Sequence, residues 1–472
     1  MFGLHFNDSM NRRTFLRGAL LVAGLSASGS LLSACSTSAP APSKAPSQPA
    51  AGAAPNGAPA QPAAPAAKAP AAVKGSSLSI LQGTYFIAPG QDLYKKQAQE
   101  WGTQNGVTVN TDFLNWPDLQ PKIAAAIQAG GLDIVELWPV WNYLYRDNLV
   151  DLTDMAQEVG QRGGGYEAYV ENSAKVGDKY LGIPHGTSNA SMAYRVSWFK
   201  EVGVPNAEDG TKLDLSWDQY FDVAKKLKAK GHPFGQALGH STGDPPGFTY
   251  PYMWANGAME LESDGKTVAF NKPEFVDGMK RFVQAWKDGY DETGTSWDDS
   301  NNNRAYLAGQ IASTYNGSSI YFTAKKENPD IAQDTHHMLI PSGPTGRFYL
   351  LETRTFAILK NSKNVDTAKA FLAWWFEDKQ YGDWFHLQEG YFLQNSKKWA
   401  SDPMWEKDPK MAPFRDQPKY GRNQGYAGPG TEKASLAWSK YIIVDTFAKA
   451  VQSGDVQGAI SWGADELQKI YR

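Results

Sequence analysis

The chain has 472 residues, with 46 Lys and Arg against 49 Asp and Glu and a formal net charge of −3. Hydrophobic residues make up 42% and charged residues 20%, which is typical of a soluble globular protein able to bury large cores without disulfide or metal support. No basic excess indicates a nucleic-acid partner. The single cysteine, Cys35, excludes an internal disulfide and a metal site built on cysteines.

The first 34 residues have the layout of an export signal. Arg12, Arg13 and Arg17 precede an apolar stretch over residues 19–32, which small residues interrupt. A charged region, a short apolar region and small residues before a cleavage site are typical of secretory signals. Because the apolar stretch is too short and too weak to span a bilayer, we expect residues 1–34 to be a removable export signal peptide.

Two motifs in this segment indicate how export ends. Leu32-Ser33-Ala34-Cys35 resembles the bacterial lipobox, which implies that Cys35 is lipidated and becomes the first residue. Residues 11–17 resemble the twin-arginine export motif, with Asn11 in place of the usual Ser or Thr, and a chance arginine pair before a general secretory signal is the alternative. Acyl chains on Cys35 would provide a two-chain anchor. We expect localisation at the outer face of the cytoplasmic membrane, held there by lipid.

Residues 36–75 consist almost entirely of Ala, Pro, Ser and Gly. Such a segment cannot bury enough apolar surface to fold, and its prolines favour an extended polyproline II conformation. The sequence therefore predicts a lipidated cysteine and an Ala/Pro-rich tether over residues 35–75. A tether between a membrane anchor and a folded domain indicates a protein that works within reach of a membrane partner.

The folded part begins with alternating strands and helices. Apolar residues predict a strand near residues 78–81, a helix over 92–105 and a second strand over 107–113. Apolar residues every fourth position over 119–127 predict another helix, which Gly130 ends, and residues 133–137 read as a third strand. This alternation indicates an α/β domain with a largely parallel sheet.

The middle of the chain is richer in helix. Ser216 and Gln219 form a capping box that predicts a helix running to Gly231. Pro273 begins a helix that ends at Gly289, and residues 366–376 and 456–470 also predict helices. Four aromatic residues on these predicted helices are expected to face the core: Trp101, Phe282, Trp286 and Phe371.

Several segments, in order, resemble the family of extracellular solute-binding proteins that includes maltose-binding protein and other sugar receptors. The resemblance spans residues 76–472, with Asn148 and Arg195 departing from the family pattern. Its motifs are Asp133-Ile134-Val135 with 149–153, 179–184 with Met192-Ala193-Tyr194-Arg195, Ser216-Trp217-Asp218, 306–312 with Asn316-Gly317, and 358–371.

The resemblance implies an α/β, two-lobed, periplasmic-binding-protein-like fold with hinge crossovers and a ligand cleft between the lobes. Lobe one would hold residues 76–186 and 341–394, and lobe two residues 187–340 and 395–472. The implied function is to capture a small solute, without cofactor or catalysis, and to deliver it to the membrane permease of an ABC transporter.

The candidate ligand-binding residues are mostly aromatic. Trp138 and Trp141 follow a predicted strand and are three residues apart, so on a short helical turn both rings would share a face. Aromatic walls suit the apolar faces of sugars, which favours a mono- or oligosaccharide, although core packing is the alternative for each ring. The other candidates are Tyr85 and His185 in predicted loops and, from the resemblance, Tyr252, Trp254, Asn316, Tyr391 and Trp438.

One departure leaves the identity of the sugar open. Many sugar binders of the family carry a Trp just after the Asn-Gly, where this chain has Ser318-Ser319. Tyr315 or Tyr321 could substitute for that Trp.

No nucleotide-binding, serine-hydrolase or zinc-protease motif occurs in the sequence. Residues 298–303 contain Asp298, Asp299 and three asparagines, but they lack the ligand spacing and the Gly of a calcium loop. We expect a solvated loop there, and no metal at the adjacent His336 and His337. A secreted lipoprotein hydrolase acting on polysaccharide is the main alternative function, because paired carboxylates cannot be ruled out from sequence, and a structural or adhesive surface protein is a third.

Overall fold

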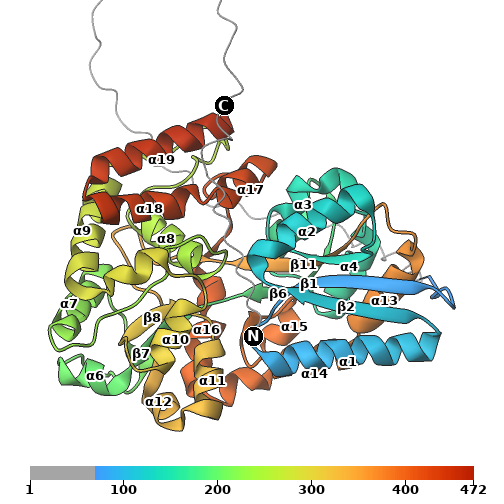
Figure 1. Ribbon diagram of the computed structural model, residues 1–472, viewed down its shortest axis with the longest axis horizontal. Helices are drawn as coiled ribbons and strands as arrows, with labels where there is room; N and C mark the ends of the chain where they lie inside the picture. Colours follow the sequence, from blue (N-terminus) through green and yellow to red (C-terminus); the bar gives the residue numbers. More distant parts are fainter. Residues whose placement is uncertain (1–69) are drawn as a thin grey trace, which may run out of the picture. The chain divides into compact units, whose positions relative to one another are not determined.

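The structure is a computed structural model that describes residues 70–472 (Figure 1). These residues belong to one compact unit spanning Ala63–Arg472. The predicted signal peptide, Cys35 and most of the predicted tether lie outside the described residues. Among residues 70–472, no helix has both the length and the apolar character needed to cross a bilayer.

Six strands form the sheet of the first lobe: β1 (Ser77–Gly83), β2 (Thr108–Leu114), β3 (Ile134–Leu137), β6 (Ile183–Ser188), β11 (Glu352–Ile358) and β12 (Phe392–Leu393). Their order is β12-β6-β11-β3-β1-β2. Strand β1 pairs in parallel with β2 and β3, whereas β11 runs antiparallel to β3 and β6, and β12 antiparallel to β6. The sheet is therefore mixed, and the prediction of a largely parallel sheet holds only for β1 to β3, which helices connect.

Helices cover this sheet as the hydrophobic spacing predicts. The first, α1 (Ala88–Asn105), buries Tyr94, Ala98 and Trp101 along one face and ends at Gly106, which has a φ of +69°. Figure 1 shows it beside α14 (Asp378–Leu387). The other helices of this lobe are α2 (Trp116–Ala129), α3 (Trp141–Leu144), α4 (Thr153–Arg162), α5 (Ala168–Ala174) and α13 (Val365–Trp375), with a small hairpin of β4 (Lys175–Val176) and β5 (Lys179–Tyr180).

A three-stranded antiparallel sheet lies in the second lobe. Its central strand β7 (Ser191–Arg195) pairs with β8 (Ser313–Asn316) and β9 (Thr335–Met338). The helices of this lobe are α6 (Val196–Glu201), α7 (Trp217–Lys228), α8 (Asp244–Ala255), α9 (Pro273–Gly289), α10 (Asn301–Leu307), α11 (Ser319–Glu327), α12 (Pro329–Asp334), α16 (Ala412–Arg415), α17 (Glu432–Ser439), α18 (Ile442–Ser453) and α19 (Val456–Tyr471). Helix α15 (Lys397–Ala400) packs on the first lobe instead, because the ring centroid of Trp399 lies 5.4 Å from that of Tyr381 in α14.

The predicted helix signals of the second lobe are confirmed. Ser216 and Gln219 form both hydrogen bonds of the capping box at the start of α7. Helix α9 begins at Pro273, ends at Gly289 and buries Phe282 and Trp286. Helices α18 and α19 run side by side (Figure 1) and pack against α9, which closes an aromatic core around Phe282.

The chain passes between the two sheets at three places. The first passage is residues 188–191, which join β6 to β7. The second leads from β9 through β10 (Tyr349–Leu350) into β11, and β10 pairs with β13 (Gly421–Arg422). The third follows β12. Residues of the first two passages lie at the cavity described below, so the fold places short connecting segments where the two lobes meet.

A buried acid, Glu260, lies in the second lobe. Its carboxyl accepts hydrogen bonds from the backbone N–H of Gly425 at 2.8 Å and from the hydroxyl of Tyr250 at 3.4 Å. Burial nevertheless raises the pKa of Glu260 to about 7, because the ionised form loses its hydration. The folded protein therefore holds this proton more tightly than the unfolded chain, where the pKa of a glutamate is about 4.3.

We expect Glu260 to make stability fall as the pH rises. Its contribution is fully present below about pH 4.3 and is lost as the pH passes about 7, a change of about 4 kcal/mol in the free energy of unfolding. Glu260→Gln should match the wild type at about pH 4 and exceed it at about pH 8 in urea unfolding. The exposed Glu327→Gln is the matched control. An equal difference between Glu260→Gln and wild type at both pH values would contradict the prediction.

Candidate ligand-binding site

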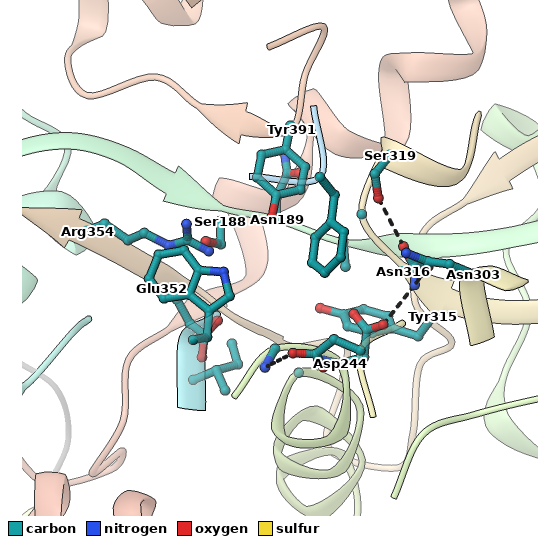
Figure 2. A pocket seen from close by; sticks show the side chains of 18 of the residues that line it. Ser188, Asn189, Asp244, Asn303, Tyr315, Asn316, Ser319, Glu352, Arg354 and Tyr391 are labelled. Carbon is teal, nitrogen blue, oxygen red and sulfur yellow. Dashed lines mark hydrogen bonds between the residues drawn. The ribbon is translucent and has the colours of Figure 1, made fainter. Parts of the chain in front are cut away.

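A cavity with a volume of about 60 Å³ lies between the two lobes (Figure 2). The first lobe contributes Phe86, Trp116, Trp138, Glu352, Arg354 and Tyr391. The second contributes Gly243, Asp244, Gly247, Asp299, Asn303, Tyr315, Asn316, Gly317 and Ser319. The passages between the sheets contribute Ser188, Asn189, Ala190 and Leu350. Aromatic rings and polar groups that can hydrogen-bond thus face the same space.

Arg354 organises the aromatic wall of the first lobe. Its guanidinium carbon lies 3.8 Å from the ring centroid of Trp116 and 4.4 Å from that of Trp138. Those two rings meet edge to face with centroids 4.9 Å apart. Side chains two residues apart on a strand point to the same face, so β11 presents Glu352 and Arg354 together. The wall is therefore held by cation–π contacts, which are strongest where the cation is desolvated.

Glu136 lies beneath this wall and is fully buried. Its Oε2 accepts from the backbone N–H of Gly83 at 3.0 Å, and its Oε1 lies 2.9 Å from His185 Nε2 and 3.7 Å from Arg354 Nη1. Burial lowers the pKa of His185, so the ring is neutral and its Nε2–H donates to Glu136. Glu136 and Arg354 thus form a buried pair of opposite charges that fixes the position of the guanidinium.

The opposite wall carries two aspartates at the start of α8. Asp299 accepts from the backbone N–H groups of Gly243 at 3.1 Å and Asp244 at 2.8 Å, so it caps the positive end of that helix. Asp244 Oδ2 accepts from the side-chain amides of Asn302 and Asn316, both at 2.7 Å. Burial raises the pKa of Asp244, and the adjacent Asp299 raises it further.

The segment 298–303 is not the solvated loop that we expected from the sequence. Asp298 accepts from the backbone N–H groups of Ser300 and Asn301 and thereby starts α10. The helix turns Asn302 into the interior, where it is fully buried, and Asn303 toward the cavity. The loop interpretation was wrong because these polar side chains bond to the backbone and to Asp244 instead of water. Within residues 70–472, no group of three His, Cys, Asp or Glu side chains could hold a metal ion.

Several polar atoms around the cavity have no hydrogen-bond partner among the described residues. They are Glu352 Oε1, Arg354 Nε and Nη1, Ser188 Oγ, and both side-chain polar atoms of Asn189. Leaving such a buried group unpaired costs about 1–3 kcal/mol. These atoms are therefore available to hydrogen-bond with polar groups that enter the cavity.

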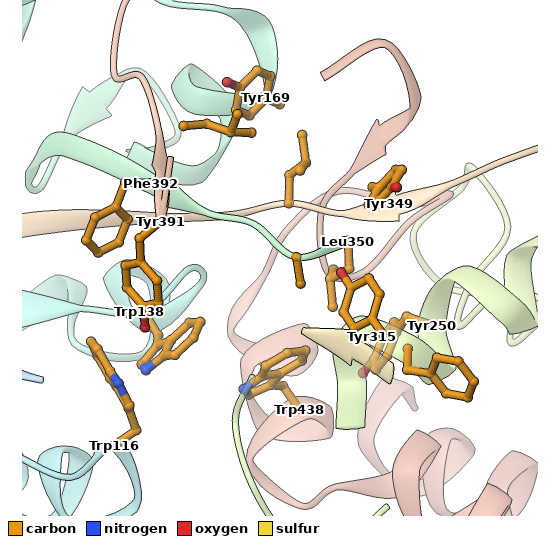
Figure 3. Packing of buried hydrophobic residues seen from close by; sticks show 14 of the residues in the cluster. Trp116, Trp138, Tyr169, Tyr250, Tyr315, Tyr349, Leu350, Tyr391, Phe392 and Trp438 are labelled. Atoms are coloured by element: carbon orange, nitrogen blue, oxygen red, sulfur yellow. The ribbon is translucent and has the colours of Figure 1, made fainter. Parts of the chain in front are cut away.

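Three of the predicted ligand-binding residues line the cavity: Trp138, Asn316 and Tyr391. Figure 3 shows Trp138 and Tyr391 near Trp116, with Tyr315 on the opposite side. Asn316 donates to Asp244, as described above. Tyr315, one of the two residues suggested to replace the missing Trp, is among the lining residues, whereas Tyr321 lies outside the cavity and its hydroxyl donates to Asp408 at 2.9 Å.

The other predicted residues do not line the cavity. In the first lobe, the Tyr85 hydroxyl donates to Gln82 at 2.5 Å, and it is the neighbouring Phe86 that lines the cavity. Trp141 lies at the start of α3, and His185 lies below the wall. Both tryptophans are 2% exposed, but only Trp138 lines the cavity, so the predicted binding role of Trp141 and its alternative, core packing, are left to the variants proposed below.

In the second lobe, three predicted residues lie in aromatic packing. Tyr252 lies 4.9 Å from Trp217 between ring centroids, and its hydroxyl donates to Gly278 O at 2.7 Å. Trp254 packs against Tyr426 at 5.6 Å, and Trp438 packs against Tyr250 at 5.6 Å. No contact with a ligand tests these three assignments, and they too stay predictions.

Sequence reasoning missed the charged residues of the site. Glu352 and Arg354 occur in a strand whose seven residues are all buried, and two charges in such a strand are a usable signal, since charged residues are rarely buried without a partner. Asp244 precedes two prolines at a helix start, a pattern that is common and carries little information. Trp116 had no distinguishing signal among 16 tryptophans.

The comparisons with known proteins agree with this architecture. The family model for bacterial extracellular solute-binding proteins matches residues 96–413. No curated protein sequence matches the chain.

Among solved structures, maltose-bound MalE3 of T. maritima is similar at 18% identity and a TM-score of 0.71, covering 84% of this chain and all of that one. An ABC transporter solute-binding protein of Thermotoga lettingae bound with α-D-tagatose is similar at 17% identity and a TM-score of 0.72. The match covers 84% of this chain and 100% of that one. A sugar transporter of Arthrobacter chlorophenolicus with bound laminaribiose is similar at 15% identity and a TM-score of 0.71. The match covers 83% of this chain and 99% of that one.

The structural likeness confirms the predicted two-lobed α/β fold, and the family model covers more than half of the chain. The predicted resemblance is confirmed: the chain belongs to the bacterial extracellular solute-binding protein family.

Proposed function

We propose that the protein captures a carbohydrate outside the cytoplasmic membrane and delivers it to the permease of an ABC transporter. The observation that carries this proposal is the cavity between the lobes, where Trp138, Tyr391 and Phe86 adjoin unpaired polar atoms. Sugars present apolar C–H faces and polar edges, so rings and hydrogen-bonding groups in one cavity suit them. The solved proteins that bind maltose, α-D-tagatose and laminaribiose support the same class of ligand.

Hinge motion is part of the proposal. The cavity volume of about 60 Å³ is well below the range of about 300–1,000 Å³ usual for small-molecule sites. A sugar can enter only if the walls separate, and the walls come from different lobes. The boundaries expected from the sequence, 341 and 394, are moved by the contacts: Ser342 and Thr345 hydrogen-bond to the second lobe, and Trp399 packs on the first. We propose that the lobes exchange the chain near these places and that residues 188–191 act as one hinge segment.

Anchoring is also part of the proposal. The lipobox-like Leu32–Cys35 and the Ala/Pro-rich segment behind it support a lipid on Cys35 and a tether to the folded lobes. Export would follow the twin-arginine or the general secretory route. A lipid anchor would keep the protein near the permease and raise its effective concentration there.

Carbohydrate capture is tested with a panel of mono- and oligosaccharides. At 100 times its Kd a ligand stabilises the folded protein by about 2.7 kcal/mol, so the ligand should raise the melting temperature. Small-angle scattering with that sugar should show a smaller radius of gyration. The sugar should be recovered intact after prolonged incubation. Cleavage without compaction would favour the polysaccharide hydrolase instead, and a response to no sugar would contradict the proposal.

Trp138 and Trp141 offer a paired test with the sugar found in that panel. Trp138→Ala should weaken binding at least tenfold, because a ring at the cavity is lost. Trp141→Ala should lower the free energy of unfolding by about 3–5 kcal/mol as a core truncation does, with little change in Kd. Calorimetry on the folded variants and urea unfolding measure the two effects. An unchanged Kd in Trp138→Ala would contradict a ligand wall there.

The anchor is tested by metabolic labelling with an alkyne fatty acid. The wild type should carry the label, and Cys35→Ala should carry none, since Cys35 is the only thiol in the chain. Ser36→Ala is the matched control and should keep the label. Label on the Cys35→Ala variant, or none on the wild type, would contradict lipidation at Cys35.

A further inference from the structure

We propose that the carbohydrate bound at this site carries a protonated amine, which faces the carboxylates of Asp244 and Glu352. The inference rests on the proposed function of carbohydrate capture and narrows its ligand to amine-bearing sugars. It is drawn from the balance of charge around the cavity.

Among the described residues that line the cavity, Arg354 is the one cation, and it already faces a buried acid. Arg354 Nη1 lies 3.7 Å from Glu136 Oε1, and both side chains are almost entirely buried. Its guanidinium is also covered by Trp116 at 3.8 Å and Trp138 at 4.4 Å. Because Arg354 already offsets Glu136, it offsets Glu352 only in part.

Asp299 also has its own compensation. Its carboxylate accepts from two backbone N–H groups, those of Gly243 and Asp244, at the N-terminus of α8. The unpaired N–H groups and the dipole of a helix start stabilise a negative charge. Burial raises the pKa of Asp299, but these hydrogen bonds oppose that shift, so Asp299 needs a cation from the ligand less than Asp244 and Glu352 do.

Asp244 and Glu352 are left without a comparable partner. Asp244 has neutral amide donors on Oδ2 only, from Asn302 and Asn316. Glu352 is 5% exposed, and among the described residues its side chain makes no hydrogen bond and no ion pair within 4 Å. Figure 2 shows both side chains at the edge of the same open space. Two buried acids thus face one cavity, and among the described residues neither has a cation within 4 Å, although Arg354 offsets Glu352 in part.

The pKa directions agree with this geometry. Burial raises the pKa of Glu352, which Arg354 only partly opposes, while Asp299 and Asp244 raise it further. The acids are therefore close enough to disfavour one another's ionised form. A ligand ammonium group removes that penalty and donates three hydrogen bonds, whereas a neutral hydroxyl donates one and leaves the repulsion in place.

The aromatic side of the cavity is compatible with the same ligand. Phe86 is 39% exposed although it lines the cavity, and Tyr391 lines it too. Rings of this kind bind the apolar face of a sugar and also attract a cation through their π face. The two acids supply the selectivity for charge, and the rings supply contact area to any sugar.

The test compares matched pairs of sugars that differ in one group: glucosamine with glucose, galactosamine with galactose, mannosamine with mannose, and the corresponding disaccharides. Isothermal titration calorimetry on the full folded chain measures each Kd. We expect the amine member of the pair that binds to have a Kd at least tenfold lower than its neutral partner. The N-acetylated sugars, which lack the charge, should behave as the neutral partners do.

Two isosteric variants test the assigned acids. Glu352→Gln and Asp244→Asn should each lose most of the preference for the amine, measured as the ratio of the Kd values of the neutral and the amine sugar. Asn at position 244 keeps an oxygen that can accept from Asn302 and Asn316, so the fold should be preserved. Glu327→Gln, on the exposed face of α11, removes a carboxylate elsewhere and should keep the preference. Melting temperatures without sugar check that each variant is folded.

The number of protons released on binding shows whether the amine binds Asp244 and Glu352 in their ionised form. If the amine binds ionised carboxylates whose pKa values are raised, binding releases protons, and affinity for the amine rises with pH over the range in which the amine itself stays protonated. Titration in two buffers of different ionisation enthalpy measures this release, which should shrink in Glu352→Gln. The other titratable and charged groups around these acids are Glu136, His185, Tyr250, Asp298, Asp299, Tyr315, Arg354, Tyr391 and Tyr441.

Each outcome decides the proposal. Equal or tighter binding of the neutral sugars overturns the amine inference and leaves carbohydrate capture intact. An amine preference that survives both acid variants also overturns it. Binding of aliphatic amines such as putrescine, with no response to any sugar, overturns carbohydrate capture and with it this inference. No binding by any member of the panel contradicts both.

Discussion

The wall of the first lobe depends on the contacts of one buried carboxylate, that of Glu136. It lies on β3 and reaches the backbone of Gly83 in β1, the ring of His185 in β6 and the guanidinium of Arg354 in β11. One buried carboxylate thus ties four strands of the sheet at their cavity end. Removing one partner of a buried charge pair typically costs about 3–5 kcal/mol, so the position of Arg354, and with it the stacking of Trp116 and Trp138, depends on Glu136.

In the second lobe, main-chain hydrogen bonds at the start of a helix position the polar groups of the cavity. Helix α8 points its N-terminus at the cavity, and Asp299 caps that end through two backbone N–H groups. The cap fixes Asp244, the first residue of the helix, which in turn orients Asn316 at the end of β8. The acids of this wall are therefore positioned by main-chain hydrogen bonds, so their geometry is rigid although they come from separate segments.

The sequence predicted the fold well because local patterns determine its elements. The spacing of Tyr94, Ala98 and Trp101, and the capping box at Ser216, need no knowledge of the rest of the chain. The site was predicted only in part, because its residues meet across the two lobes. Trp138 and Trp141 read alike in sequence, yet the backbone turn between them directs only Trp138 to the cavity. The sequence predicted Asp299 in a solvated loop, because Asp244 at the start of α8, to which it bonds, lies 55 residues away in the chain.

The energetics of closure follow from where the lobes touch. Two ion pairs join lobe to lobe outside the cavity, Arg146 with Glu432 and Lys325 with Glu389, and all four side chains are about half exposed. Exposed pairs contribute about 0–1 kcal/mol each, so they guide the approach of the lobes without holding them together. The unpaired polar atoms at the cavity oppose closure, because they lose water and gain no partner. A ligand that pairs them favours the closed form selectively, and only such a difference in affinity can shift the equilibrium between open and closed lobes.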